Sequence, residues 1–276
     1  MKIKYLGTAA AEGIPAIFCH CEICKHAREH GGKNIRTRAQ ALIDDKIMLD
    51  LGPDTYLHLL AYKLDITELE HCFITHVHDD HFVPGQVLYR QKGYGYVKPG
   101  TRPLTIYGSE DVGRAMNVSQ ESAVTKDGSV LYKEVRPYEM IEVEEYKITA
   151  LPAYHGTDHP YIYIIEKDGK RLLYAHDTDV FFEEVWRYLE EKHIRFDLVS
   201  LDCTEGVKSM DYHCHMNFER DMTVKERMIK SGLVYPYTIF VANHFSHNGQ
   251  TTYDRACEMA KECQMLVTYD GMEIEF

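Results

Sequence analysis

The stretch Thr75-His76-Val77-His78-Asp79-Asp80-His81 is the most informative part of this sequence of 276 residues. It follows an apolar segment, Cys72–Thr75, that we predict to be a buried strand. Imidazole and carboxylate groups together suit zinc, manganese or iron. A solvated histidine-rich loop is the alternative, but three histidines and two aspartates in six residues directly after an apolar strand argue against it.

The spacing within this motif predicts two metal ions rather than one. His76 and His78 point to the same side of an extended segment, because side chains alternate with a period of two. The turn that follows brings Asp80 and His81 to a second side. One short loop is therefore expected to serve two ions about 3.5–4 Å apart, as in two-metal hydrolases.

Further metal-capable residues recur just past three later apolar strands. His155 follows Ile148–Pro152, Asp177 follows Leu172–Ala175, and His244 follows Thr238–Ala242. A single histidine or aspartate at a strand end is usually a cap or a surface residue. Their recurrence, together with the loop motif, predicts one joint site.

The wider pattern predicts many short strands with a few helices between them. Strands are predicted over Ile3–Leu6, Ala41–Ile43, Lys46–Leu49, Cys72–Thr75, Thr105–Tyr107, Ile148–Leu151, Tyr161–Ile165, Arg171–Tyr174, Leu198–Leu201, Thr238–Val241, Met265–Val267 and Met272–Ile274. Helices are predicted over Phe181–Lys192, Asn217–Ser231 and Tyr253–Glu262, the last capped by Thr252 or Asp254. Hairpin turns are predicted at Asp44-Asp45, Lys167–Lys170 and Asp270-Gly271. This organisation indicates an α+β protein, an αββα sandwich of two mixed β-sheets flanked by helices, with residues 1–276 as one domain.

The composition limits the kinds of molecule that the protein is expected to bind. Hydrophobic residues make up 45% and charged residues 27%, which is ordinary for a globular protein, and the net charge is -12. Negative surface repels phosphate chains, so we expect a small anionic substrate and no broad nucleic-acid binding. No signal peptide and no run of about 18 apolar residues is visible. We therefore expect no membrane association and a cytoplasmic protein; a homodimer is left open.

A second cluster, Cys19-His20-Cys21-Glu22-Ile23-Cys24, offers three thiolates. A tetrahedral structural zinc needs a fourth ligand, for which His247 is the natural candidate. His20, His26 and His30 compete with it, and three unligated thiols are the alternative. His247 would tie this loop to the one that contains His244.

The complete motif resembles that of hydrolases with the metallo-β-lactamase fold. The resemblance implies one metal held by His76, His78 and His155, and a second held by Asp80, His81 and His244. It also implies that Asp177 bridges the two ions, with a hydroxide between them. Asp50, in Leu49-Asp50-Leu51-Gly52-Pro53, matches a recurring buried aspartate that orients ligands; a turn aspartate is the alternative.

Within that superfamily the chain looks similar to the PhnP group of phosphodiesterases, which open a 1,2-cyclic ribose phosphate. The opening Gly7-Thr8-Ala9-Ala10-Ala11-Glu12-Gly13-Ile14-Pro15, the cysteines and the C-terminal Asp270–Ile274 carry this resemblance. PqqB-like proteins share the cysteines but usually lack an intact histidine motif. The long arm of tRNA 3′-processing endonucleases is not evident. Three parts depart from PhnP and are expected to border the pocket: Thr204–Tyr212, His215 and the loop Gln91–Pro103.

The resemblance implies hydrolysis of a small, cyclic phosphodiester with two divalent ions, zinc or manganese, besides one structural zinc. Asp80 is then expected to take part in catalysis. His213 or His215 would protonate the leaving group, since imidazole titrates near neutral pH. The match to His-Cys in PhnP favours His213, whereas the distance to the helix predicted to begin near Asn217 favours His215. A lactone or thioester hydrolase is the alternative activity, and a non-catalytic metal-binding protein is a further one.

Overall fold

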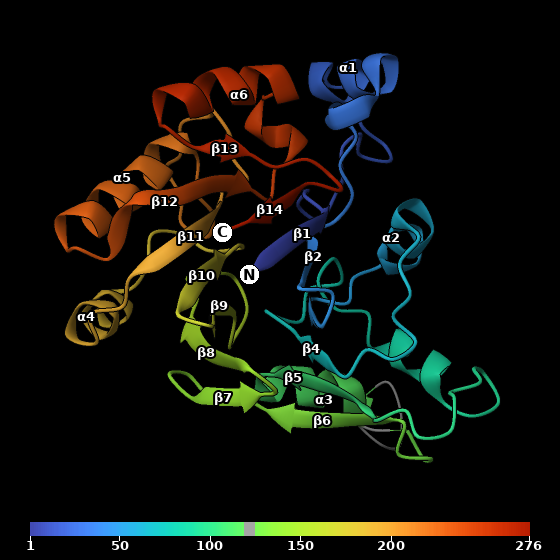
Figure 1. Cartoon of the computed structure of the whole chain (residues 1–276). Helices are drawn as coiled ribbons and strands as arrows, with labels where there is room; N and C mark the ends of the chain where they lie inside the picture. Colours follow the sequence, from blue (N-terminus) through green and yellow to red (C-terminus); the bar gives the residue numbers. More distant parts are fainter. Residues whose placement is uncertain (119–124) are drawn as a thin grey trace.

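Two seven-stranded mixed sheets form the centre of the molecule (Figure 1). The structure, a computed structural model, describes residues 1–118 and 125–276. The first sheet has the order β14 (Glu273–Glu275), β1 (Lys2–Gly7), β2 (Gln40–Ile43), β3 (Ile47–Leu49), β4 (His71–Phe73), β5 (Leu104–Gly108) and β6 (Val130–Glu134). The second has the order β13 (Leu266–Val267), β12 (Val234–Asn243), β11 (Phe196–Asp202), β10 (Lys170–Ala175), β9 (Tyr161–Lys167), β8 (Tyr146–Pro152) and β7 (Met140–Val143).

Both sheets combine antiparallel and parallel pairs. In the first sheet β14, β1, β2 and β3 pair antiparallel, and β3 to β6 pair parallel. In the second sheet β7 to β10 pair antiparallel, and β10 to β13 pair parallel. β8, β10, β11 and β12 therefore run in one direction, and their carboxyl ends meet at one edge of the sheet.

Alternating side chains divide the apolar residues among three cores. On β3, Ile47 and Leu49 pack between the sheets, while Met48 packs on the outer face. On β10, Leu172 packs between the sheets and Leu173 faces outward. Since both faces of both sheets are covered, the strands read as continuous apolar runs.

Helices cover the outer faces. They are α1 (Glu22–His30), α2 (Thr55–Tyr62), α3 (Glu110–Val118), α4 (Glu183–Glu191), α5 (Phe218–Lys230) and α6 (Tyr253–Glu262), with 3₁₀ segments at Gly32–Asn34, Pro84–Arg90 and His247–Gly249. The helices α4, α5 and α6 lie along the second sheet (Figure 1), and Trp186, Val224 and Ala260 pack into its outer core. On the first sheet Val112 and Met116 of α3 do the same. The predicted αββα sandwich is confirmed. No helix in the described ranges is long and apolar enough to cross a membrane.

Two of the three predicted hairpins form. Asp44 and Asp45 have φ of 49° and 58°, and Asp168 and Gly169 have φ of 50° and 75°. Positive φ at both central residues matches the twist of the flanking strands. The third prediction, at Asp270-Gly271, is wrong: β13 pairs with β12 in the second sheet, and β14 pairs with β1 in the first. The segment between them crosses from one sheet to the other.

The predicted strands and helices all have counterparts, but several elements were not predicted: α1, α2, α3, β6 and β7. The helix α2 buries Thr55 and His58 and exposes Tyr56, Leu57 and Leu60, so its apolar residues do not mark the buried face. Thr252 caps α6 by accepting from the backbone N–H of Arg255, one of the two predicted alternatives.

Candidate metal centre

The edge at which the strands end brings the sequence-predicted residues together. His76 follows β4, His155 follows β8, Asp177 follows β10 and His244 follows β12. The two sheets are joined here, because the backbone N–H of Tyr161 donates to the carbonyl oxygen of Thr75 at 2.8 Å. Loops from both sheets thus converge on one place.

The first group of ligand-type side chains consists of His76, His78, His155 and Asp177, whose donor atoms lie within 4.8 Å of one another. His78 Nδ1 lies 3.0 Å from Nε2 of His76 and 3.1 Å from Nε2 of His155. Asp177 Oδ2 lies 3.3 Å from His76 Nε2. Three imidazole nitrogens and one carboxylate oxygen face a common point.

The second group consists of Asp80, His81, Asp177 and His244, all four buried, again with their donor atoms within 4.8 Å. His81 Nε2 lies 2.8 Å from Asp177 Oδ2, 3.2 Å from Asp80 Oδ2 and 3.3 Å from His244 Nε2. Asp177 belongs to both groups. It therefore stands between two adjacent positions, each surrounded by further donors.

The outward-facing nitrogens of His76, His81, His155 and His244 each have a hydrogen-bond partner. His81 Nδ1 donates to Asp50 Oδ2 at 2.7 Å, and His244 Nδ1 lies 2.8 Å from the Thr204 hydroxyl. His155 Nδ1 lies 3.2 Å from the carbonyl oxygen of Cys214. A proton on each outward nitrogen leaves the inward nitrogen with a free lone pair, which is the tautomer that binds a metal.

Three observations show that divalent cations fit this arrangement. The inward nitrogens lie only 3.0–3.3 Å apart, so with protons on the outward nitrogens their lone pairs would face one another, an arrangement that a shared cation relieves. Oδ1 of Asp177 is buried and makes no hydrogen bond within the described residues, although His215 Nδ1 lies 3.2 Å from it. Finally, four buried carboxylates lie within or beside the groups, and two dications would balance their charge. These are Asp50, Asp80, Asp177 and Asp202.

The backbone is strained where it presents these side chains. Asp50, Asp177 and His244 have φ of 67°, 50° and 62°, in the left-handed region that non-glycine residues rarely adopt. Such conformations cost free energy and cluster at functional sites. Gly52 permits close packing behind the motif, since a Cβ there would lie 2.1 Å from the carbonyl oxygen of Asp80.

Sequence reasoning missed the role of Asp202. Its carboxylate accepts from the backbone N–H groups of Asp177, Thr204 and Met216 at 2.9–3.0 Å, and it is fully buried. It therefore holds together three loops at the site. The signal was present, because Asp202 follows the predicted strand Leu198–Leu201 as His155, Asp177 and His244 follow theirs.

His215 and His213 occupy different surroundings. His215 Nδ1 lies 3.2 Å from Asp177 Oδ1 and 3.3 Å from Asp202 Oδ2, and its ring meets that of His155 edge to face. Burial opposes the charge of His215, but the carboxylates of Asp202 and Asp177 raise its pKa to about 9. His213 stacks on Tyr154, pairs through Nδ1 with Asp179, and leaves 64% of its side chain exposed. Of the two, His215 is the one in contact with the ligand-type residues.

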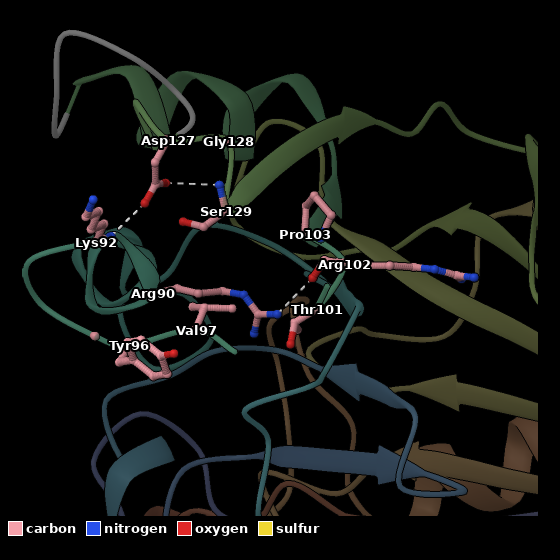
Figure 2. A pocket seen from close by; sticks show the side chains of 11 residues that line it. Arg90, Lys92, Tyr96, Val97, Thr101, Arg102, Pro103, Asp127, Gly128 and Ser129 are labelled. Atoms are coloured by element: carbon pink, nitrogen blue, oxygen red, sulfur yellow. Dashed lines mark hydrogen bonds between the residues drawn. The ribbon is translucent and has the colours of Figure 1, made fainter. Parts of the chain in front are cut away.

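The loop Gln91–Pro103, expected to border the pocket, lines another part of the surface. Several of its residues line a hollow of about 500 Å³ together with Arg90 and Ser129; Figure 2 shows these side chains from close by. None of the residues that line it belongs to the two ligand groups. The Thr204–Tyr212 segment, by contrast, begins at Thr204, which holds His244.

The cysteine cluster gathers as predicted around His247. Its Nδ1 lies 3.5 Å from the sulfur atoms of both Cys19 and Cys21, and Cys24 completes the group. None of the competing candidates, His20, His26 and His30, belongs to this group; His26 and His30 stack on each other along α1, with ring centroids 4.0 Å apart. Three sulfurs and one imidazole are a ligand set that tetrahedral zinc accepts.

Cys21→Ser is expected to lower the melting temperature by roughly 5–15 °C, because metal-binding free energy at such a site is partly folding free energy. Zinc content should fall by one equivalent, with the histidine groups still loaded. Differential scanning calorimetry and elemental analysis measure both quantities. Cys257→Ser is the matched control, since Cys257 is half-buried and outside the described metal-type clusters. An unchanged melting curve and zinc content for Cys21→Ser would refute the assignment.

Comparison with known proteins identifies the family. Residues 45–263 match the family model described as a beta-lactamase superfamily domain. The chain belongs to the beta-lactamase superfamily. Among curated relatives of this superfamily protein, ribonuclease Z of Listeria innocua is 26% identical over 181 residues, covering 63% of this chain and 52% of the relative. The chain thus spans about half the length of the curated relatives that it matches.

Solved structures of the superfamily share the fold. A diphosphatase from the PhnP family superposes with a TM-score of 0.76 at 20% identity, covering 100% of this chain and 98% of the other. Zinc-bound PqqB from Methylobacterium extorquens gives 0.68 at 18% identity, with 100% of both chains covered. The predicted resemblance to metallo-β-lactamase-fold proteins is confirmed. The superfamily fold implies divalent metal ions, for which the two histidine groups are the candidates.

Proposed function

We propose that this protein is a divalent-metal-dependent hydrolase that opens a small, cyclic phosphodiester. The observation that carries the proposal is the pair of ligand groups that share Asp177, with His215 against the same carboxylate. Because the motif residues come from the first sheet and His155, Asp177 and His244 from the second, we also propose that residues 1–276 work as one domain.

In this proposal His76, His78 and His155 would hold one ion and Asp80, His81 and His244 would hold the other, with Asp177 available to both. Two such ions would lower the pKa of a water molecule and neutralise charge on the phosphoryl oxygens. Asp50 and Thr204 fix the orientation of the histidines by accepting their outward N–H groups. The carboxylate of Asp202 fixes the loop of Asp177 by accepting a hydrogen bond from the backbone N–H of Asp177.

We assign protonation of the leaving alkoxide to His215. A general acid must reach the reacting groups, and His215 contacts Asp177 whereas His213 contacts Asp179. Two carboxylates hold the His215 ring from its Nδ1 side, which leaves Nε2 to act on the substrate. His213, exposed and stacked on Tyr154, then serves as part of the pocket wall.

The choice of a small phosphodiester rests on similarity and on charge. The curated relatives include ribonuclease Z of Listeria innocua, and the PhnP-family neighbour is a diphosphatase. Two dications would capture a compact anion locally, whereas a long RNA would also meet the surface of a chain with net charge -12. A ribonuclease Z activity is the second candidate, since the curated sequence relatives have that name.

The proposal is tested by offering one preparation, loaded in turn with zinc and with manganese, four substrates: a ribose 1,2-cyclic phosphate, bis-p-nitrophenyl phosphate, a precursor tRNA with a 3′ trailer, and an acyl lactone. We expect the highest kcat/KM for the cyclic phosphate in at least one metal. Cleavage of the precursor tRNA with little activity on the cyclic ester would support the ribonuclease instead. Turnover of the lactone alone would assign a carbonyl hydrolase.

A further inference from the structure

A separate cluster of histidine and carboxylate groups lies at the edge of the sandwich opposite the metal centre. Glu70 and His71 stand at the amino end of β4, whereas His76 follows its carboxyl end. Glu144 lies in the turn between β7 and β8, at the amino end of β8. The ligand atoms of these three residues lie within 4.8 Å of one another. The cluster therefore joins the first sheet to the second.

His71 presents an unused ligand atom to this cluster. Its Nε2 is buried, has no hydrogen-bond partner within the described residues, and lies 4.0 Å from Glu70 Oε2. That distance is too long for a hydrogen bond, and it exceeds the roughly 3.4 Å between two donors of one tetrahedral zinc, so the two side chains would have to move slightly closer to share an ion. Its Nδ1 lies 3.2 Å from the Tyr107 hydroxyl. If Nδ1–H donates to Tyr107, Nε2 carries a lone pair, and a cation is the partner that it lacks.

Each carboxylate of the cluster is paired with a basic side chain that a metal ion could replace. Arg102 pairs with Glu70 at 3.3 Å, and its side chain is 72% exposed. In Figure 2 that side chain extends away from the hollow lined by Arg90 and Ser129. Lys46 pairs with Glu144 at 3.0 Å. Exposed ion pairs of this kind contribute little free energy, so a dication bound directly by both carboxylates and an imidazole can displace or share them.

We propose that Glu70, His71 and Glu144 form a further divalent-cation site that clamps the two sheets at this edge. One imidazole and two carboxylates favour zinc, manganese or another first-row transition metal over magnesium or calcium, which prefer all-oxygen sites. Three protein ligands leave the remaining positions to water. Burial lowers the pKa of His71, so the imidazole is neutral at pH 7 and available to coordinate. The site is independent of the proposed hydrolysis.

The test is a calorimetric titration of Zn²⁺ into protein that has been loaded with zinc and then dialysed, so that the tighter sites stay filled. Wild type should show a binding event of about one equivalent, with a matching rise in melting temperature. His71→Gln and Glu144→Gln should weaken that event by at least about 100-fold, and Tyr107→Phe by about 10–100-fold, as expected for loss of a partner behind the ligand.

Glu68→Gln is the matched control. Glu68 lies beside Glu70 and Glu144 in a second surface hollow, different from that of Figure 2. It pairs with Lys98 and is outside the cluster. It should bind zinc like wild type. Glu144 lies in a partly exposed turn, so Glu144→Gln still tests the site if His71→Gln fails to fold. Absence of the event in wild type, its appearance only at millimolar zinc, or equal binding by Glu144→Gln would overturn the proposal.

Discussion

Asp177→Ala is expected to reduce phosphodiester hydrolysis by more than about 10³-fold, because Asp177 is the one residue common to both ligand groups. Its removal leaves each of the two metal positions with one ligand fewer. It also leaves the buried imidazoles of His76 and His81 without the carboxylate oxygen at 3.3 and 2.8 Å. Elemental analysis should show the loss of up to two equivalents of metal, alongside the kinetic loss.

Asp179→Ala is the control for that experiment. Asp179 is also buried and lies two residues further on, but it pairs with His213 and with Arg220 at 2.9 Å. It should keep the metal of the histidine groups and most of the activity. Full metal content and near-normal turnover in Asp177→Ala would mean that the two groups are not the catalytic centre, whatever the protein hydrolyses.

His215→Ala is expected to lower turnover by roughly 10²–10⁴-fold on a substrate with a poor alkoxide leaving group, without emptying the metal centre. The loss should be much smaller with bis-p-nitrophenyl phosphate, because p-nitrophenolate departs without a proton. His213→Ala should show a small effect that does not depend on the leaving group. Initial rates on the two substrates, with metal content measured in parallel, give the comparison.

Other outcomes of this experiment would change the residue that is assigned as the general acid. If His213→Ala alone carries the loss that depends on the leaving group, the stacked and exposed imidazole moves into the site when substrate binds. If neither variant shows such a dependence, both histidines only line the pocket. A loss of metal in His215→Ala would instead indicate that His215 acts as a ligand, through its contact with Asp177.

The sequence was sufficient where the decisive signal is local. The motif His76–His81 follows a strand directly, so alternation along the chain predicts which of its side chains face the same side. Apolar runs ending in His155, Asp177 and His244 predict residues at strand ends, and parallel strands place such ends at one edge. Asp202 obeys the same rule and could have been found by it. The hairpin turns at Asp44-Asp45 and Asp168-Gly169 have positive φ angles. They were predicted because a tight turn depends mainly on its own residues.

Tertiary structure alone decided the features that depend on which segments meet. The Asp270-Gly271 turn resembles a hairpin locally, yet its flanking strands belong to different sheets, because pairing partners are chosen by packing rather than by the turn. The helix α2 escaped prediction because it exposes Tyr56, Leu57 and Leu60. The proposed choice of His215 over His213 likewise rests on contacts with Asp177 and Asp179, and no spacing within one short segment encodes contacts with another part of the chain. Sequence patterns thus predicted which side chains are of ligand type and the sheet edge where they gather, while the exact partners of each side chain required the packed fold.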